Sequence, residues 1–313
     1  MEREAGQVAE PALLSTVKAV VEGIRPKQWT KNLIVYFALF FTIQEAWDLS
    51  EPTAFLPLLG RATLAFLLFS ALTGAVYLVN DVFDADKDRA HPKKRRRPIA
   101  SGRLAPSLAL VVAGLLVAGS LALSFLLSPS FGGVAAGYLA LMLAYTVWLK
   151  RLVLLDVFSI SGGFVLRAVA GAAVLAVPIS PWLYIVTGLG ALLIALGKRR
   201  SELERAGDEA AGQRESLEHY TKSLVDQFIA VVAPSTLVAY TLYTFTAPNL
   251  PGNHAMMLTI PFVVYGLFRY LYLVHARNLG ENPEDIVVTD LPLIVCILGW
   301  LATAATILVV SRG

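Results

Sequence analysis

Four side chains whose oxygen atoms can bind a metal ion follow a long apolar segment. They form the pattern Asn-Asp-x-x-Asp-x-x-x-Asp, from Asn80 to Asp88. If the helix of that segment continues through the motif, Asp81, Asp84 and Asp88 share one face, at i, i+3 and i+7. Carboxylates this close repel one another unless a cation lies between them. Mg²⁺ takes a few carboxylates and completes its shell with water and phosphate oxygens. The motif therefore predicts catalytic aspartates and a magnesium site, with Asn80, Asp81, Asp84 and Asp88 as ligands, that binds a diphosphate.

A basic stretch follows these acids directly. An acidic cluster at a helix end is often only a solvated surface, but here the acids lead into His91 and five consecutive basic residues, Lys93–Arg97. Such a run is denser than a topology signal requires. Lysine and arginine suit phosphate oxygens, so Lys94 and Arg97 are expected to hold a phosphate. For His91, a phosphate ligand and a hydrogen-bonded loop histidine are equally good interpretations.

The composition indicates a membrane protein. Hydrophobic residues make up 56% of the 313-residue chain and charged residues 16%, with a mean hydropathy of +0.64, against about 45–50% and 25% in soluble domains. Residues 1–12 are expected to be a disordered tail with no cleavable signal peptide, and residues 13–313 one integral membrane domain. The single Cys296 excludes a thiolate metal cluster.

Nine apolar segments are expected to be membrane-spanning helices, because backbone groups in lipid must be satisfied internally. They cover approximately 30–44, 55–80, 106–127, 131–149, 153–176, 181–197, 224–247, 255–275 and 290–310. With a cytoplasmic N-terminus, 23 of the 26 lysines and arginines lie on the cytoplasmic side, as the positive-inside rule requires. The pI near 8.9 therefore reports topology and not nucleic-acid binding. The predicted fold class is all-α: about nine transmembrane helices around a central cavity.

Other polar residues near the membrane are further candidates. Arg167 lies three turns from Asp156 on one helix face, about 16 Å deeper. An arginine inside a membrane either faces a functional cavity or partners a buried polar group, and both interpretations stay open. Lys31 and Asn32 are expected to meet a lipid phosphate. The inner end of the fourth segment supplies two more binding candidates, Tyr145 and Lys150.

The Asp-rich motif, at the inner end of the second of nine spans, resembles the UbiA superfamily of intramembrane prenyltransferases. Two further stretches resemble its decaprenyl-phosphate phosphoribosyltransferase branch, which uses 5-phosphoribosyl diphosphate: RPKQWTKN at 25–32 and HPKKRRRPIASG at 91–102. The resemblance covers roughly residues 20–310. It implies a cavity open to the cytoplasm and laterally to lipid, Mg²⁺ bridging the Asp-rich motif and a diphosphate, and a bacterial-type plasma membrane.

One loop departs from the wider family's pattern. In the branches that prenylate aromatic compounds, a second Asp-x-x-x-Asp motif follows the sixth span, whereas this chain has GKRRSELER at 197–205. A site that gathers a diphosphate, a 5-phosphate and a lipid phosphate requires extra cations, so Lys198 and Arg199 are expected to bind anions. Glu202 is interpreted as a salt-bridge partner of Lys198 in preference to a second metal ligand.

The function predicted from these features is transfer of 5-phosphoribosyl from 5-phosphoribosyl 1-diphosphate to a polyprenyl (decaprenyl) phosphate, with release of pyrophosphate, for cell-wall arabinan precursors. The partners are the two substrates and the lipid bilayer; a homo-oligomer is left open. The first alternative is prenyl transfer to an aromatic acceptor such as 4-hydroxybenzoate. The second is a transporter of anionic lipids, which would require charged residues on both sides of the membrane; the outer connections contain only three acids and no lysine or arginine.

Overall fold

The chain folds into a bundle of membrane-spanning helices. The computed structural model describes residues 12–48, 52–178, 180–206, 215–280 and 283–312, and these contain no β-strand. The expected tail, residues 1–12, lies outside this part apart from Ala12. Within it, eight helical spans are long and apolar enough to cross a membrane. They are α3 (Pro52–Phe83), α5 (Pro106–Leu127), α6 (Pro129–Val147), α7 (Leu155–Leu175), α8 (Pro181–Ala206), α9 (Lys222–Thr246), α10 (Ile260–Ala276) with the 3₁₀ turn η6 (Ala255–Thr259), and α12 (Leu291–Arg312).

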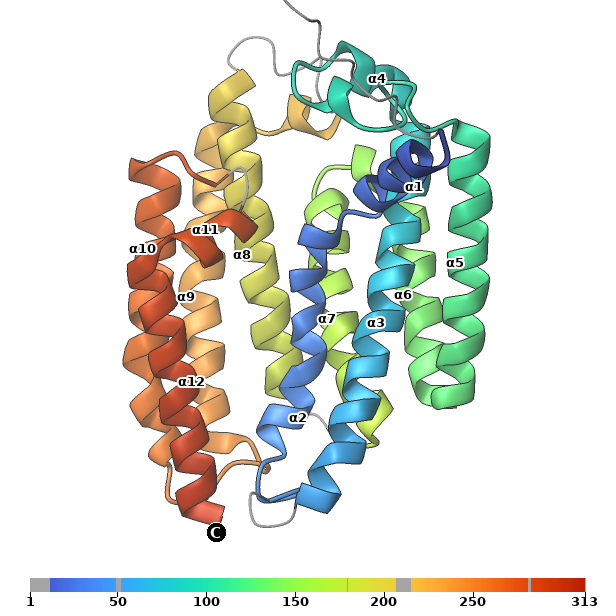
Figure 1. Cartoon of the computed structure of the whole chain (residues 1–313). Helices are drawn as coiled ribbons and strands as arrows, with labels where there is room; N and C mark the ends of the chain where they lie inside the picture. The colour runs from blue at the N-terminus through green and yellow to red at the C-terminus, as the bar shows by residue number, and fades with distance from the viewer. Residues whose placement is uncertain (1–11, 49–51, 179, 207–214, 281–282, 313) are drawn as a thin grey trace, which may run out of the picture.

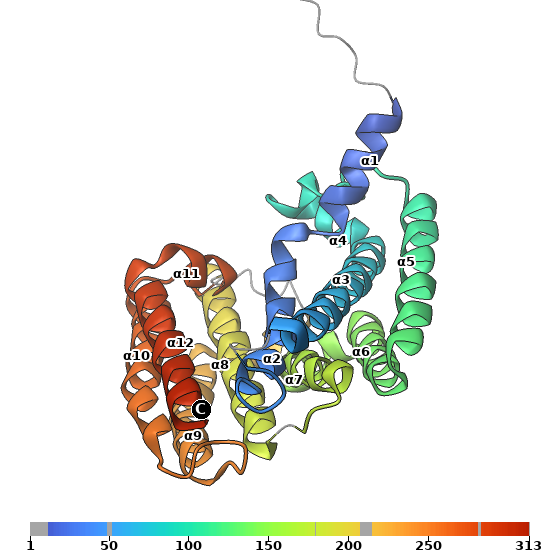
Figure 2. The same cartoon turned by 60° about the horizontal axis from the view of Figure 1, so that its bottom comes forward.

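Two groups of spans lie on either side of the N-terminal segment. Helices α3, α5, α6 and α7 form one group and α8, α9, α10 and α12 the other (Figures 1 and 2). Short elements gather at the end where α1 (Ala12–Gly23) lies. These are α4 (Ala85–Ala90), η2 (Lys94–Arg96), η3 (Leu149–Arg151), η5 (Glu215–His219) and α11 (Pro283–Thr289). The loops that carry most of the basic residues therefore share one end of the bundle.

The first span differs from the predicted helix. After α1 the chain turns at Arg25, whose φ of 52° is left-handed, and then runs as the 3₁₀ helix η1 (Pro26–Tyr36) and the short helix α2 (Phe37–Phe41). At about 2.0 Å and 1.5 Å per residue, these 16 residues extend about 30 Å, the thickness of a bilayer core. A long 3₁₀ backbone at this depth is tolerated where protein surrounds it, and η1 packs against α3 and α7. Hydropathy alone cannot distinguish a 3₁₀ span from an α-helix.

Gly171 lets η1 approach α7 closely. A Cβ built there would lie 2.1 Å from the carbonyl oxygen of Val35. We expect Gly171→Ala to push η1 away from α7 and to lower the free energy of unfolding by about 1–3 kcal/mol, as overpacking does. The measurement is the thermal midpoint of the purified protein. Gly137→Ala is the matched control, because a Cβ at Gly137 meets nothing within 4 Å; equal midpoints for the two variants would contradict the close-packing role.

Candidate functional site

The Asp-rich motif lies at a junction between two helices, so the condition under which Asp81, Asp84 and Asp88 would share one helix face is not met. Helix α3 ends at Phe83, and α4 begins at Ala85. Asp84 occupies the junction with φ −96° and ψ 3°, outside the helical region. Asp86 of α4 points into solvent with its side chain 94% exposed. The break separates the three remaining carboxylates into two groups.

Asp81 and Asp88 form the first group, and Arg97 joins them. The Nη1 atom of Arg97 donates to Asp81 Oδ1 at 3.1 Å and to Asp88 Oδ2 at 2.6 Å. Both carboxylates are buried, with residue exposures of 2% and 3%. Burial raises the pKa of Asp88, and the charge of Arg97 partly offsets this effect. Arg25 forms a further ion pair with Asp81, so one carboxylate faces two guanidinium groups.

Asp84 and Asn80 form the second group, around Lys150 of η3. The Nζ atom of Lys150 lies 2.6 Å from Asp84 Oδ1 and 3.4 Å from Asn80 Oδ1. Asn80 also donates its Nδ2 to Asp84 Oδ2 at 3.0 Å. Lys150 comes from a different loop, between α6 and α7, so the structure brings this predicted binding residue directly onto the Asp-rich motif.

The donor atoms of the motif suit a divalent cation, but their present partners are basic side chains. Three carboxylates and a carboxamide oxygen are the hard ligands that Mg²⁺ prefers. As these side chains lie, no three histidine, cysteine or acidic residues of the described ranges form a group that could hold a metal ion. Arg25, Arg97 and Lys150 take up carboxylate oxygens of the motif. The residues fit the metal chemically, and a metal bound to these same oxygens would displace the basic groups.

His91 closes the loop after α4. Its Nδ1 atom accepts the backbone N–H groups of Lys93 and Lys94 at 3.2 and 3.3 Å. Burial lowers the pKa of His91, and the neighbouring Lys94 charge adds to the effect. This geometry favours the loop role of His91 over the phosphate role. Four other predicted binding residues are half-buried: Lys31, Lys94, Tyr145 and Lys198.

Arg199 is buried in a second charged cluster. Its Nε donates to Asp156 Oδ2 at 2.8 Å, and its Nη1 pairs with Glu202. Asp156, with no exposed surface, also accepts the hydroxyls of Tyr220 at 2.8 Å and Ser216 at 3.2 Å. The cluster ties α7, α8 and the stretch that leads into α9. Arg199 was predicted to bind an anionic substrate, and the structure instead turns its guanidinium towards protein carboxylates.

Arg167 and Asn32 belong to a third polar network, inside the first group of spans. The arginine donates from Nε to Asn32 Oδ1 at 2.7 Å and from Nη2 to the Tyr138 hydroxyl at 2.8 Å. Asn32 in turn donates to Ser70 Oγ at 3.0 Å. Arg167 is 5% exposed and Asn32 is fully buried. Of the two interpretations of Arg167, the structure favours a partner for buried polar groups, which holds η1 between α3 and α7.

Sequence reasoning missed some of these residues. Arg25 lies in one of the stretches that resemble the family. Its pairing with Asp81, 56 positions later in the sequence, is visible only in the fold. Tyr138 and Tyr220 had no sequence signal, because Tyr138 is an isolated tyrosine in an apolar segment and Tyr220 stands in a polar stretch without a recognisable motif. Asp290, just before α12, accepts the backbone N–H of Leu293 at 3.0 Å and pairs with Arg269 of α10.

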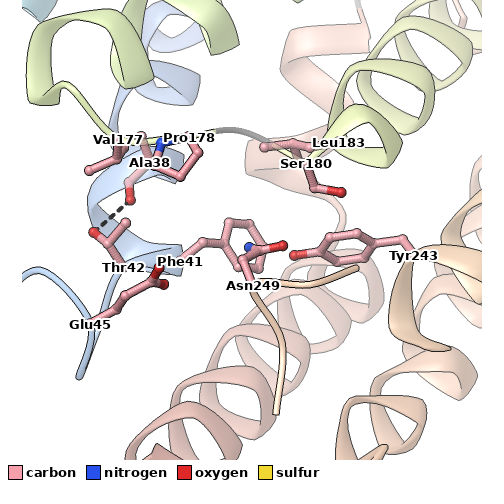
Figure 3. Close-up of a pocket in the computed structure, with 10 residues that line it drawn as sticks. All are labelled: Ala38, Phe41, Thr42, Glu45, Val177, Pro178, Ser180, Leu183, Tyr243 and Asn249. Atoms are coloured by element: carbon pink, nitrogen blue, oxygen red, sulfur yellow. Dashed lines mark hydrogen bonds between the residues drawn. The ribbon is translucent and has the colours of Figure 1, made fainter. Parts of the chain in front are cut away.

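Two cavities lie deeper in the bundle. The larger, of about 260 Å³, is apolar and lies between α2, α7, α8, α9 and α12, where Phe37, Phe164, Ala191, Tyr240 and Trp300 line it. The smaller, of about 20 Å³, is lined by Phe41, Thr42 and Tyr243 (Figure 3), near α2 and far from α4 (Figure 1). A volume of that size holds about one water molecule, so it cannot be the substrate site. The larger cavity exceeds the roughly 150 Å³ that encloses benzene.

Comparisons with known proteins identify the family and the fold. Residues 33–284 match the model of the UbiA prenyltransferase family. The chain is 36% identical, over 92% of its length and 93% of the relative's, to decaprenyl-phosphate phosphoribosyltransferase of Mycobacterium tuberculosis strain H37Rv. It is 34% identical to the protein of the same name from Mycolicibacterium smegmatis, over 97% and 96% of the two chains. A UbiA homolog from Archaeoglobus fulgidus, solved with GPP and Mg²⁺, has the same fold: the TM-score is 0.71 at 17% identity, over 93% of this chain and 99% of that one.

Proposed function

As this chain belongs to the UbiA prenyltransferase family, we propose that it transfers 5-phosphoribosyl from 5-phosphoribosyl 1-diphosphate to a polyprenyl phosphate and releases pyrophosphate. The similarity over nearly the whole chain to decaprenyl-phosphate phosphoribosyltransferases carries the proposal. The cations around the Asp-rich motif support it, since Arg25, Arg97 and Lys150 meet there. A donor with a diphosphate and a 5-phosphate, together with an acceptor phosphate, brings more negative charge than a prenyl diphosphate does.

The site would work mainly by positioning and electrostatics. Asn80, Asp81, Asp84 and Asp88 would hold Mg²⁺, which supplies Lewis-acid neutralisation of the leaving diphosphate when bound. Arg97 and Lys150, once released from the carboxylates, would contact phosphate oxygens of the donor, and the half-buried Lys94 and Lys198 would add positive charge nearby. The acceptor phosphate is already ionised at neutral pH, so its attack on the anomeric carbon requires no general base from the protein.

The acceptor's isoprenoid tail would begin in the apolar cavity. At about 260 Å³, less than twice the volume of a cavity that encloses benzene, this space holds only one or two isoprene units. The rest of a long tail would lie against lipid-facing helix surfaces. Residues 13–313 would form one membrane domain, with the Asp-rich motif at the cytoplasmic side of a bacterial plasma membrane, because the basic loops share that end.

The main competing function is aromatic prenyl transfer. It would favour a second pair of aspartates after the sixth span, where this chain has Lys198, Arg199 and Glu202. Glu202 pairs with the buried Arg199, so one of the acids of this loop already serves the protein's own cluster. This pairing favours a site with one acidic motif.

The test is a two-substrate assay with purified protein and Mg²⁺. Labelled 5-phosphoribosyl 1-diphosphate is supplied with polyprenyl phosphate in one reaction, and labelled prenyl diphosphate with 4-hydroxybenzoate in the other. We expect the product lipid to carry label from the ribose donor only. A prenylated aromatic product with no labelled ribosyl lipid would refute the proposed function.

A further inference from the structure

We propose that Arg25 is an internal counter-ion of Asp81, which competes with the metal and couples metal binding to diphosphate binding. In this role Arg25 holds Asp81 when neither ligand is present and contacts the diphosphate when both are bound. The role given to Arg25 rests on the proposed function, because it assumes a diphosphate at this site.

The backbone at Arg25 adopts a strained conformation next to the Asp-rich motif. Arg25 lies between α1 and η1 with φ 52° and ψ 68°, in the left-handed region. That conformation costs a residue with a Cβ on the order of 1–2 kcal/mol, and strain of this kind is often found where function requires it. The next residue, Pro26, begins η1. The turn therefore directs Arg25 to the Asp-rich motif just before the chain enters the bundle.

Two contacts hold the side chain in reach of Asp81. The guanidinium lies over the ring of Tyr77, 4.7 Å from its centroid, and Tyr77 stands one turn before Asp81 on α3. Arg25 also pairs with Asp81 itself. The arginine side chain is 24% exposed, whereas the aspartate side chain is 2% exposed. The partly exposed arginine can leave without unpacking a helix, whereas the buried Asp81 would stay in place.

The charges of the site explain why release of Arg25 from Asp81 would require a diphosphate. Asp81, Asp84 and Asp88 pair with Arg25, Arg97 and Lys150, so the group is neutral. A divalent cation alone would compete with three basic groups and leave them unpaired in a partly buried place, which is costly. A diphosphate that arrives with the metal offers oxygens to the released cations. Each ligand therefore raises the affinity of the site for the other, since coupling is reciprocal.

The test measures metal binding directly, with no acceptor and no turnover. Mn²⁺ binding to the purified protein is followed by electron paramagnetic resonance, with and without inorganic pyrophosphate. For the wild type we expect weak Mn²⁺ binding that pyrophosphate strengthens at least about fivefold, the lower range of typical coupling. For Arg25→Gln we expect tighter binding of Mn²⁺ alone and a smaller gain from pyrophosphate, because a competing cation is absent.

The controls separate this role from a structural latch. Arg89→Gln removes an arginine of α4 that pairs with the exposed Asp86; we expect wild-type Mn²⁺ binding. Arg25→Lys keeps the charge and should stay close to the wild type. If Arg25→Gln is poorly folded, Tyr77→Leu, which removes the ring beneath the guanidinium, should shift Mn²⁺ binding in the same direction.

Mn²⁺ binding to Arg25→Gln that is unchanged or weaker, with the same pyrophosphate gain as the wild type, would overturn the counter-ion role. The two proposals fail separately. Absence of phosphoribosyl transfer in the two-substrate assay would refute the proposed function. It would leave the Mn²⁺ result intact, since a prenyl diphosphate donor also carries the diphosphate group that pyrophosphate represents.

Discussion

Replacing Asp84 with asparagine is expected to lower kcat for phosphoribosyl transfer on the order of 10³-fold, the upper range for loss of one group that stabilises transition-state charge. Asp84 is the most exposed of the three paired carboxylates, at 25% of its side chain, and it lies where two helices meet. Asparagine keeps the size and the bond to Asn80 but removes the charge that attracts the metal. The measurement is initial rate against Mg²⁺ concentration.

Asp86→Asn is the matched control for that experiment. Asp86 lies two residues away in α4, but its side chain is 94% exposed and pairs only with Arg89 among the described contacts. Exposed pairs of this kind contribute about 0–1 kcal/mol, so we expect near wild-type kcat. Equal activities for Asp84→Asn and Asp86→Asn would remove the metal-binding role of Asp84.

Replacing Asp156 with alanine is expected to destabilise the protein by about 3–5 kcal/mol, the usual result when one partner of a buried ion pair is removed. Asp156 accepts hydrogen bonds from Arg199, Tyr220 and Ser216 with no exposed surface. Alanine would remove one of the two carboxylates that pair with the guanidinium of Arg199, which is 1% exposed. The thermal midpoint of the purified protein should fall sharply.

Glu22→Gln is the control for that variant, because Glu22 and Arg103 form a pair in which both side chains are about half exposed. Its midpoint should stay close to that of the wild type. A double variant, Asp156→Leu with Arg199→Met, should recover part of the loss, since it leaves no unpaired buried charge. Asp156→Ala with an unchanged midpoint and a much higher KM for the donor would show instead that the cluster binds substrate.

The chain's chemistry was easier to predict than its geometry. The apolar segments predicted the eight regular spans, because length and hydropathy are what a bilayer selects. The 3₁₀ form of 26–36 could not be predicted, since it depends on contacts with α3 and α7, such as the approach of Val35 to Gly171. The break at Asp84 had no glycine or proline to indicate it.

In the candidate site, the sequence likewise could not show which charged side chains pair with one another. Asp81, Asp84 and Asp88 were predicted as site residues from their spacing, and Lys150 from its place at a span end. Residue type also identified Arg199 as a cation near the membrane. Only the fold could show that the guanidinium of Arg199 pairs with Asp156, 43 positions earlier in the sequence. In the same way, only the fold shows that Arg25 pairs with Asp81 of the Asp-rich motif. A sequence shows which charges are present, but distant partners decide which of them remain available for a substrate.

The most direct test of the central account follows two labels in one donor. The donor, 5-phosphoribosyl 1-diphosphate, carries ¹⁴C in the ribose and ³²P in the terminal phosphate of its diphosphate. It is incubated with polyprenyl phosphate, Mg²⁺ and purified protein, and the lipid and aqueous phases are counted. We predict ¹⁴C in the lipid and ³²P in aqueous pyrophosphate, in equal amounts and only when polyprenyl phosphate is present. Absence of ¹⁴C from the lipid, or ³²P accompanying it there, would contradict phosphoribosyl transfer with diphosphate as the leaving group.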